Sequence, residues 1–127
     1  MSQPPQPRCT FPRSRRLGGG AHFDRVFDAG VKVPRGPILA FARPNGLPHP
    51  RLGLSVSRRV GCAAVRNRIK RLLREAFRLH QHDLPAGYDL VLIVRPHEPL
   101  ILPEYGKIMV YVMLKLHQAW QLKQQGG

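Results

Sequence analysis

The segment RNRIKRLLREAFR, residues 66–78, constrains the fold most, because it forms a single amphipathic pattern within a helix expected at about 63–81. At about 100° per residue, its cationic and amide side chains share an arc of about 140°: Arg66, Asn67, Lys70, Arg71, Arg74 and Arg78. Apolar residues take the opposite side: Val65, Ile69, Leu72, Leu73, Ala76 and Leu79. Arg68 and Glu75 lie at one boundary and Phe77 at the other. A helix with such an apolar face has to pack on a sheet or on other helices.

Stability alone does not explain the cationic face of this helix. Four of its residues are spaced four apart and are all positive, and each such pair is repulsive by about a few tenths of a kcal/mol: Arg66, Lys70, Arg74 and Arg78. Only Glu75, four residues after Arg71, is expected to offer local relief. A row of phosphates would neutralise this face, so the pattern favours nucleic-acid binding over a solvated face or a membrane surface. Asn67 either bonds a ribose or base edge or fixes the helix start.

The charge of the whole chain agrees with this interpretation. The 127 residues include 21 Lys and Arg against 7 Asp and Glu, which gives a formal net charge of +14. Such an excess favours a polyanionic partner, and the length suits one domain. The chain has no apolar run long enough for a membrane span and no signal-peptide pattern at its start. We therefore expect a cytoplasmic protein with no membrane contact.

The rest of the sequence predicts one mixed sheet with helices, an α+β domain over residues 21–123. Residues 1–20 are rich in Pro, Gly and Arg and predict a flexible basic arm, and 124–127 a disordered tail. Helices are expected at 21–29 and within 102–123, where Trp120 continues an apolar row of core residues. Strands are expected at 38–43, 51–57 and 88–95, the first two paired as a hairpin with a long loop.

The acidic residues provide no recognisable active site. Phosphodiester hydrolysis usually needs metals held by carboxylates, but the seven carboxylates are scattered: Asp24, Asp28, Glu75, Asp83, Asp89, Glu98 and Glu104. Cys9 and Cys62 form no metal-ligand spacing with the histidines. We therefore expect neither a catalytic residue nor a metal site in the polypeptide.

A longer block around the basic helix, GLSVSRRVGCAAVRNRIKRLLREAFR at residues 53–78, resembles the bacterial ribonuclease P protein subunit, and RNR at 66–68 is its most specific part. HFDRVFDAG at 22–30 and LPAGYDLVLIVRP at 84–96 support the resemblance, which covers roughly residues 13–120. It implies a single αβββαβα domain with a mixed four-stranded sheet and an extra strand near residues 31–33. It also implies that the RNR helix lies in a left-handed crossover between parallel strands, where the general rule is right-handed.

The resemblance also implies a function, which is to help a catalytic RNA remove the 5′ leader of precursor tRNA. The family's contacts with the catalytic RNA map onto Arg66, Asn67, Arg68, Lys70, Arg71 and Arg74. Its leader cleft, between the first helix and the sheet, maps onto Phe23, Phe27, Phe41, Arg58 and Arg59. The Mg²⁺ of the reaction would be held mainly by the RNA subunit and the substrate. No protein partner is implied.

Two other functions stay open from the residues alone. One is a structural RNA-binding protein of the ribosomal type, and the other is a stand-alone metal nuclease, which the scattered carboxylates disfavour. Phe23 and Phe27 also fit ordinary core positions, since they flank Val26 at helical spacing. The chain departs from the family in three features: Cys62 replaces a usually polar residue, Phe41 stands where the family often has Tyr, and the Pro-rich start at residues 1–12 is not typical.

Overall fold

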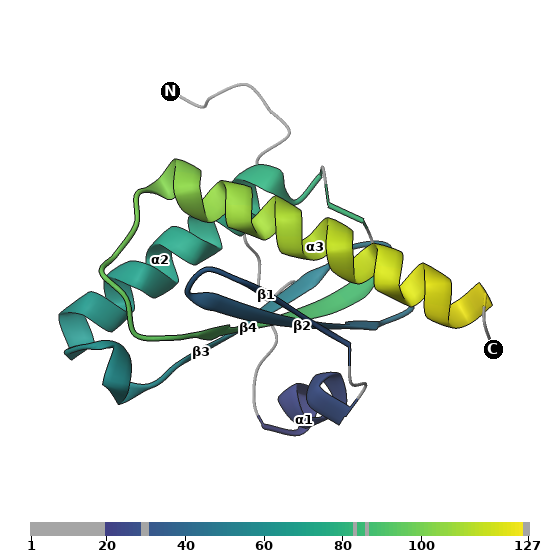
Figure 1. Ribbon diagram of the computed structural model, residues 1–127, viewed down its shortest axis with the longest axis horizontal. Coiled ribbons are helices and arrows are strands. Elements are labelled where there is room, and N and C mark those ends of the chain that lie inside the picture. Colours follow the sequence, from purple (N-terminus) through teal and green to yellow (C-terminus); the bar gives the residue numbers. More distant parts are fainter. Residues whose placement is uncertain (1–19, 29–30, 83, 86, 126–127) are drawn as a thin grey trace, which may run out of the picture.

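A computed structural model describes residues 20–28, 31–82, 84–85 and 87–125, which form a sheet with helices on both faces (Figure 1). The helices are α1 (Gly20–Asp28), α2 (Ala63–His80), α3 (Leu102–Gln125) and a short 3₁₀ helix, η2 (Arg58–Val60). The strands are β1 (Lys32–Arg35), β2 (Ile38–Pro44), β3 (Arg51–Val56) and β4 (Tyr88–Val94). The predicted αβββαβα order and mixed four-stranded sheet are confirmed.

The ends of the chain fall largely outside the described residues. Of the predicted basic arm, only Gly20 is described, and it is the first residue of α1. Of the predicted tail, residues 124 and 125 belong to α3 and the last two residues lie outside the described part.

The sheet has the strand order β1-β2-β4-β3, in which β1–β2 and β2–β4 are antiparallel and β3–β4 is parallel. The predicted hairpin of the second and third strands is therefore wrong, because β4 lies between them. The apolar sequence of β4 favours this central place, where both faces of the strand are covered and all of its residues except Ile93 are buried. The parallel neighbours β3 and β4 are joined through α2; the left-handed sense of this crossover stays a prediction.

The extra strand near residues 31–33 is present as β1, at the edge of the sheet. An edge strand tolerates Pro34, since its missing N–H interrupts no central ladder. The turn to β2 uses Gly36 at φ 55°, a left-handed conformation that favours glycine. Because Arg35 then pairs with Ile38, the hairpin is tight and its end lies under α3.

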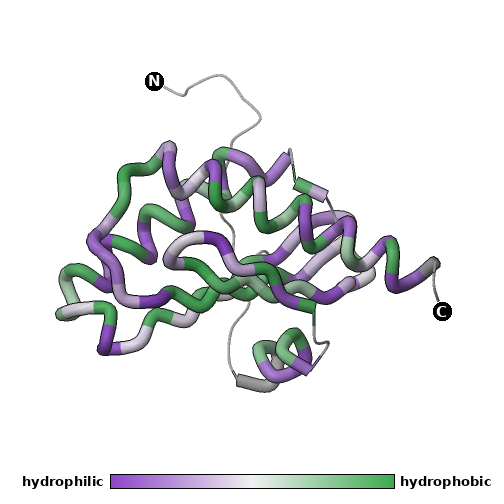
Figure 2. Tube along the Cα trace, viewed as in Figure 1, coloured by the Kyte–Doolittle hydropathy of each residue, from purple (hydrophilic) through white to green (hydrophobic). Residues whose placement is uncertain are grey.

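The main core lies between the sheet and the layer of α2 and α3 (Figure 1), and green, hydrophobic stretches run through the middle of the sheet in Figure 2. The fully buried residues of α2 are Ile69, Leu73, Ala76 and Phe77. Phe77 was expected at the boundary, and Leu79, expected on the apolar side, is 44% exposed. At about 100° per residue, these four buried residues share one continuous arc of the helix surface, with Phe77 at one edge of the arc. The buried face is therefore turned toward Phe77 and away from Leu79.

Candidate RNA-binding surfaces

The helix α2, which carries the cationic face, lies on the side of the sheet that α1 does not cover (Figure 1). All six predicted contacts with the catalytic RNA lie on this helix. Four are exposed: Asn67, Arg68, Arg71 and Arg74. Arg66 and Lys70 are half-buried, and Nε of Arg66 donates to the carbonyl oxygen of Gly61 at 3.3 Å, which ties this arginine to the start of the helix.

The one carboxylate on α2 does not relieve this face as the sequence predicted. Glu75 pairs with Arg78, whose Nε donates to Oε2 at 2.9 Å and whose second guanidinium nitrogen bonds Oε1, and not with Arg71. The hydrogen bonds from Arg78 lower the pKa of Glu75. In the described part of the chain, no carboxylate forms an ion pair with the remaining cations of α2: Arg66, Arg68, Lys70, Arg71 and Arg74.

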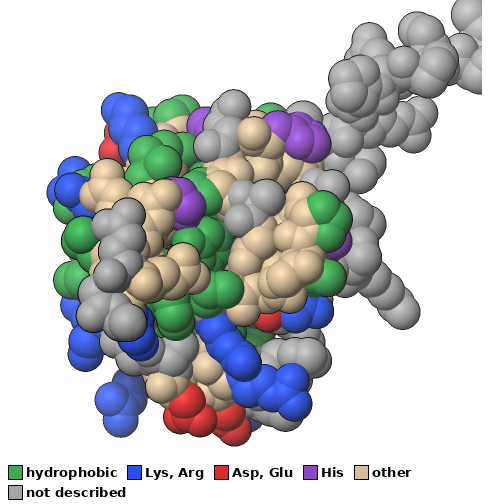
Figure 3. Space-filling model, turned by 90° about the vertical axis from the view of Figure 1, so that its right-hand side faces the viewer, with side chains coloured by type: hydrophobic (Ala, Val, Ile, Leu, Met, Phe, Trp, Pro, Cys, Tyr) green, Lys and Arg blue, Asp and Glu red, His purple; other side chains and the backbone are tan. Residues whose placement is uncertain are grey.

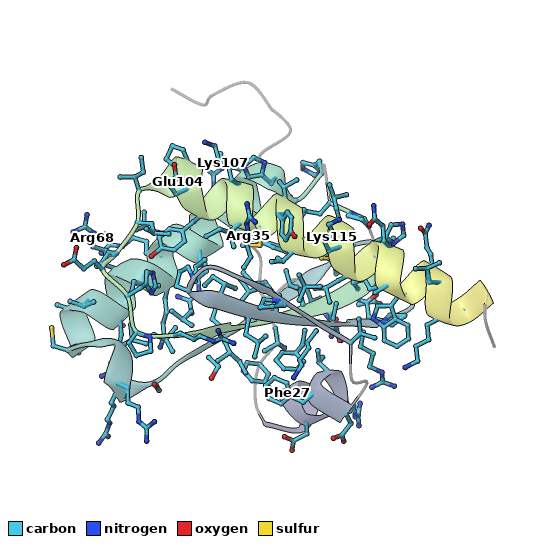
Figure 4. All side chains as sticks on the ribbon, viewed as in Figure 1. Phe27, Arg35, Arg68, Glu104, Lys107 and Lys115 are labelled. Carbon is cyan, nitrogen blue, oxygen red and sulfur yellow. The ribbon has the colours of Figure 1, made fainter. Side chains whose placement is uncertain are left out.

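Aromatic side chains gather on the other face of the sheet, between the sheet and α1. Val26 of α1 is fully buried against Val91 of β4, and three rings pack around this pair: Phe23, Phe27 and Phe41. The ring centroids of Phe27 and Phe41 are 4.9 Å apart and those of Phe23 and Phe27 are 6.3 Å apart, both edge to face. Figure 4 labels Phe27 between α1 and the sheet. Since all three rings are half-buried, they pack and also leave area for a ligand.

An arginine-rich hollow lies on the same face of the sheet as this aromatic cluster, and the sequence interpretation missed it. Its volume is about 170 Å³, and it is lined by Arg25, Arg43, Pro44, Asn45, Arg51 and Asp89. Arg51 binds Asp89 with two hydrogen bonds of 2.7 Å, and Nδ2 of Asn45 donates to the same carboxylate at 2.9 Å. Arg25 and Arg43 form no ion pair within the described residues. The alternation of β2, which puts Arg43 on the face of Phe41, could have indicated it.

Trp120 of α3 extends the same surface, although its apolar spacing predicted a core position. It is half-buried, and its Nε1 donates to the carbonyl oxygen of Ala42 at 2.8 Å. Together with Arg25, Asp28 and Arg43 it lines a second hollow of about 360 Å³. Figure 3, which views the molecule from the end where α3 finishes, shows Lys and Arg side chains below the hydrophobic middle of this face.

The two remaining predicted leader contacts lie elsewhere. Arg58 and Arg59 are exposed on η2, between β3 and α2. The register pairs Arg51 with Asp89 at one end of β3 and Val56 with Val94 at the other. Arg58 and Arg59 follow the second end, so they are separated from the arginine-rich hollow by the length of β3. Their role in leader binding stays a prediction, and their place in the chain brings them close to the start of α2.

Other chemistry on the described residues is limited. Cys62 is the exposed residue that precedes α2; its thiol makes no capping hydrogen bond, yet the nearby backbone N–H groups of Val65 and Ala64 lower its pKa. Within the described ranges, no three His, Cys, Asp or Glu side chains gather in a way that could hold a metal ion. None of the helices described here combines the length and the apolar character that crossing a membrane requires.

Comparisons with known proteins agree with this geometry. A family model described as Ribonuclease P matches residues 11–101. The ribonuclease P protein component of Pseudomonas fluorescens strain Pf0-1 is 43% identical over 105 residues, which cover 77% of this chain and 78% of the relative. That of Pseudomonas aeruginosa strain LESB58 is 44% identical, with 77% of each chain covered.

Solved structures show the same fold. The RNase P protein of Staphylococcus aureus, solved at 2.0 Å, has a TM-score of 0.70 and 30% identity, covering 81% of this chain and 94% of that one. A mutant of the Staphylococcus aureus protein with defective mRNA degradation activity has a TM-score of 0.72 and 28% identity, covering 84% and 90%. The chain therefore belongs to the ribonuclease P protein family.

Proposed function

We propose that this chain binds two RNA segments on opposite sides of its sheet: the catalytic RNA on α2 and the 5′ leader of precursor tRNA beneath α1. As a ribonuclease P protein component, the chain is part of the ribonucleoprotein enzyme that processes the 5′ end of tRNA. The observation that carries the proposal is the group of α2 cations with which no described carboxylate forms an ion pair: Arg66, Arg68, Lys70, Arg71 and Arg74. We also propose a cytoplasmic location, where this RNA processing takes place.

The α2 surface suits a structured RNA backbone. Its cations repel one another along the helix, and a bound polyanion would remove that repulsion and release counterions. The exposed Arg68, Arg71 and Arg74 offer planar donor groups that match phosphate oxygens in pairs. Half-buried Arg66 is held by its hydrogen bond to Gly61, so its side chain loses less conformational entropy when it contacts RNA.

The α1 surface suits a single strand of variable sequence. Half-buried aromatic rings stack unpaired bases at roughly 1–3 kcal/mol each, with little preference for sequence. Phe27 and Phe41 supply such rings, and Arg25 and Arg43 lie on the same face, where no carboxylate of the described residues forms an ion pair with them. Trp120 provides a further ring at the far end. This series of aromatic and cationic groups fits the alternation of bases and phosphates in a leader.

The proposal assigns no hydrolytic centre to the residues of this chain. Its Mg²⁺ ions would be held mainly by the RNA subunit and the substrate. The nearly buried carboxylate of Asp89 is already used by Arg51 and Asn45, and that of Glu75 by Arg78. The polypeptide therefore binds and positions RNA, and the catalytic centre is assigned to the RNA subunit.

The test is a cleavage assay at low Mg²⁺ with the full chain, a bacterial ribonuclease P RNA and precursor tRNA. We expect the chain to raise the rate of 5′ cleavage, and Arg68→Ala to reduce this gain by weakening the binding of the RNA subunit. Glu75→Gln/Arg78→Gln is the matched control on the same helix, because it removes a cation together with the carboxylate that it binds and leaves the net charge unchanged. No gain with the unchanged chain would reject the proposal in favour of a structural RNA-binding protein. Cleavage without added RNA would indicate a metal nuclease.

A further inference from the structure

A second group of cationic and aromatic side chains lies on α3, on the side of the sheet away from α1. Tyr111 is its centre: the guanidinium carbon of Arg35 lies 4.3 Å from the ring centroid, and the ammonium of Lys115 lies 5.8 Å from it. Arg35 reaches the ring from the end of β1, and Lys107 precedes Tyr111 by one helical turn (Figure 4). Neither proposed RNA surface includes any of these four residues.

A hollow of about 510 Å³ adjoins Tyr111, between the end of α2 and the first turns of α3. It is lined by His80, Pro103, Gly106, Lys107, Val110 and Tyr111. Gly106 lets the two helices approach here, because a Cβ at this position would meet Nε2 of His80 at 2.7 Å. The lining is mainly apolar, with Lys107 as its cation, so the hollow presents flat apolar surfaces next to positive charge.

The cations around this hollow are available to a ligand. Arg35, Lys107 and Lys115 are all exposed, and Lys107 makes only a long contact of 3.8 Å with the exposed Glu104. Within the described residues, neither Arg35 nor Lys115 forms an ion pair. Stacking on Tyr111 holds the guanidinium of Arg35 in place while its in-plane N–H groups stay free. A preoriented donor group of this kind matches two oxygens of one phosphate.

We propose that this hollow binds an unpaired nucleotide of the catalytic RNA, with the base against Tyr111 and the apolar lining. Arg35, Lys107 and Lys115 would then contact the flanking phosphates. A base has an apolar face and is joined on both sides to negative charge, which is the combination that the hollow and its surrounding cations complement.

The location of the hollow selects the catalytic RNA as its occupant. His80, the last residue of α2, lines the hollow, and α2 carries the cationic face assigned to that RNA; the inference rests on this part of the proposed function. A helix with its side chains is only about 10–12 Å across, so an RNA lying on α2 comes within reach of α3. The leader surface, in contrast, lies on the other side of the sheet (Figure 1).

The test measures binding of the full chain to a bacterial ribonuclease P RNA across a range of salt concentrations. The double variant Arg35→Ala/Lys115→Ala should bind roughly tenfold more weakly, and the slope of log K against log salt should fall by about 1.4, or 0.7 for each lost contact with a single strand. Lys32→Ala is the matched control, since Lys32 is exposed on β1 but faces the other side of the sheet. Arg35→Gln/Lys115→Gln replaces the double variant if thermal melting shows that the alanines unfold the chain.

A second measurement locates the base. Ribonuclease P RNA that carries 4-thiouridine should crosslink under ultraviolet light to the segment of α3 that contains Tyr111. Crosslinks confined to α2, or an unchanged affinity and salt slope of the double variant, would overturn the inference. Weaker binding of precursor tRNA alone would overturn it too, since the occupant would then be the substrate. Arg68→Ala separates the two proposals: if it weakens binding of the RNA subunit while the double variant does not, only this inference fails.

Discussion

Phe27 lies between Phe23 and Phe41, with ring centroids 6.3 and 4.9 Å away, and remains half-buried. The spacing of Phe23, Val26 and Phe27 predicted a shared helix face, and that much is confirmed. The sequence could not decide between a core position and a binding position for the rings. The positions of the rings depend on the register of β2, which places Phe41 beside Val91. The rings therefore lie half-buried at the rim of a small core.

Replacing Phe27 with Ala should weaken binding of precursor tRNA to the assembled enzyme, because one stacking ring worth roughly 1–3 kcal/mol is lost. Binding of mature tRNA, which has no leader, should not change. The measurement compares the dissociation constants of the two tRNAs. Val26→Ala is the control, since it weakens the packing of α1 without removing a ring. An equal loss for both tRNAs would contradict a leader contact.

At the scale of the element, the pattern of α2 predicted its cationic arc correctly but not its ion pair or the direction of its buried face. Residues three and four apart are both neighbours on a helix, so spacing alone could not choose between Arg71 and Arg78 as the partner of Glu75. The buried face turns toward Phe77 because other elements cover that side. The arginine-rich hollow was missed for a similar reason: α1, β2, β3 and β4 each supply part of it.

Arg74→Glu should stabilise the free chain and weaken its binding to the RNA subunit. The change converts the repulsive pair with Lys70 into an attractive one, and both the repulsion removed and the attraction gained are worth about 0.2–0.5 kcal/mol. Arg78 already pairs with Glu75, so its contribution changes little. We expect the free energy of unfolding, measured with urea, to rise by about 0.5–1 kcal/mol. Arg74→Gln, which removes the repulsion only, should lie between. A less stable Arg74→Glu chain would contradict the repulsion between the cations of α2. Unchanged binding of the RNA subunit would contradict a contact between Arg74 and the RNA.

The strand order shows what a pattern along the chain cannot specify. Three strands were predicted within a residue or two, yet the first two of them, β2 and β3, were wrongly paired with each other. A hairpin is the simplest pairing for consecutive strands. Here the apolar sequence of β4, buried on both faces, stabilises its insertion between β2 and β3 more than a direct pairing would.

At the scale of the whole molecule, the net charge of +14 opposes compaction of the free chain. Raising sodium chloride from about 20 to 300 mM should therefore raise the free energy of unfolding by about 1 kcal/mol, because screening weakens the self-repulsion. Affinity for the RNA subunit should fall over the same range. Thermal melting and binding titrations measure the two trends.

Sodium sulfate at matched ionic strength is the control for this prediction. Because sulfate also stabilises folded chains by its exclusion from the protein surface, the comparison includes the Arg35→Ala/Lys115→Ala variant. An extra stabilisation by sulfate that this variant lacks would mean that anions bind at the cations beside Tyr111 in addition to screening. A melting temperature that falls as chloride rises would contradict the role of self-repulsion.

The central position of β4 has a further consequence. Leu90 and Leu92 face the layer of α2 and α3, while Val91 faces α1, so a single sheet separates the two proposed RNA surfaces. Packed layers lie about 10 Å apart. Under the proposed function, with one RNA on each side, the domain would act as a spacer of fixed thickness. It would set the distance from leader to catalytic RNA at about two layer spacings, whatever the sequence of the leader.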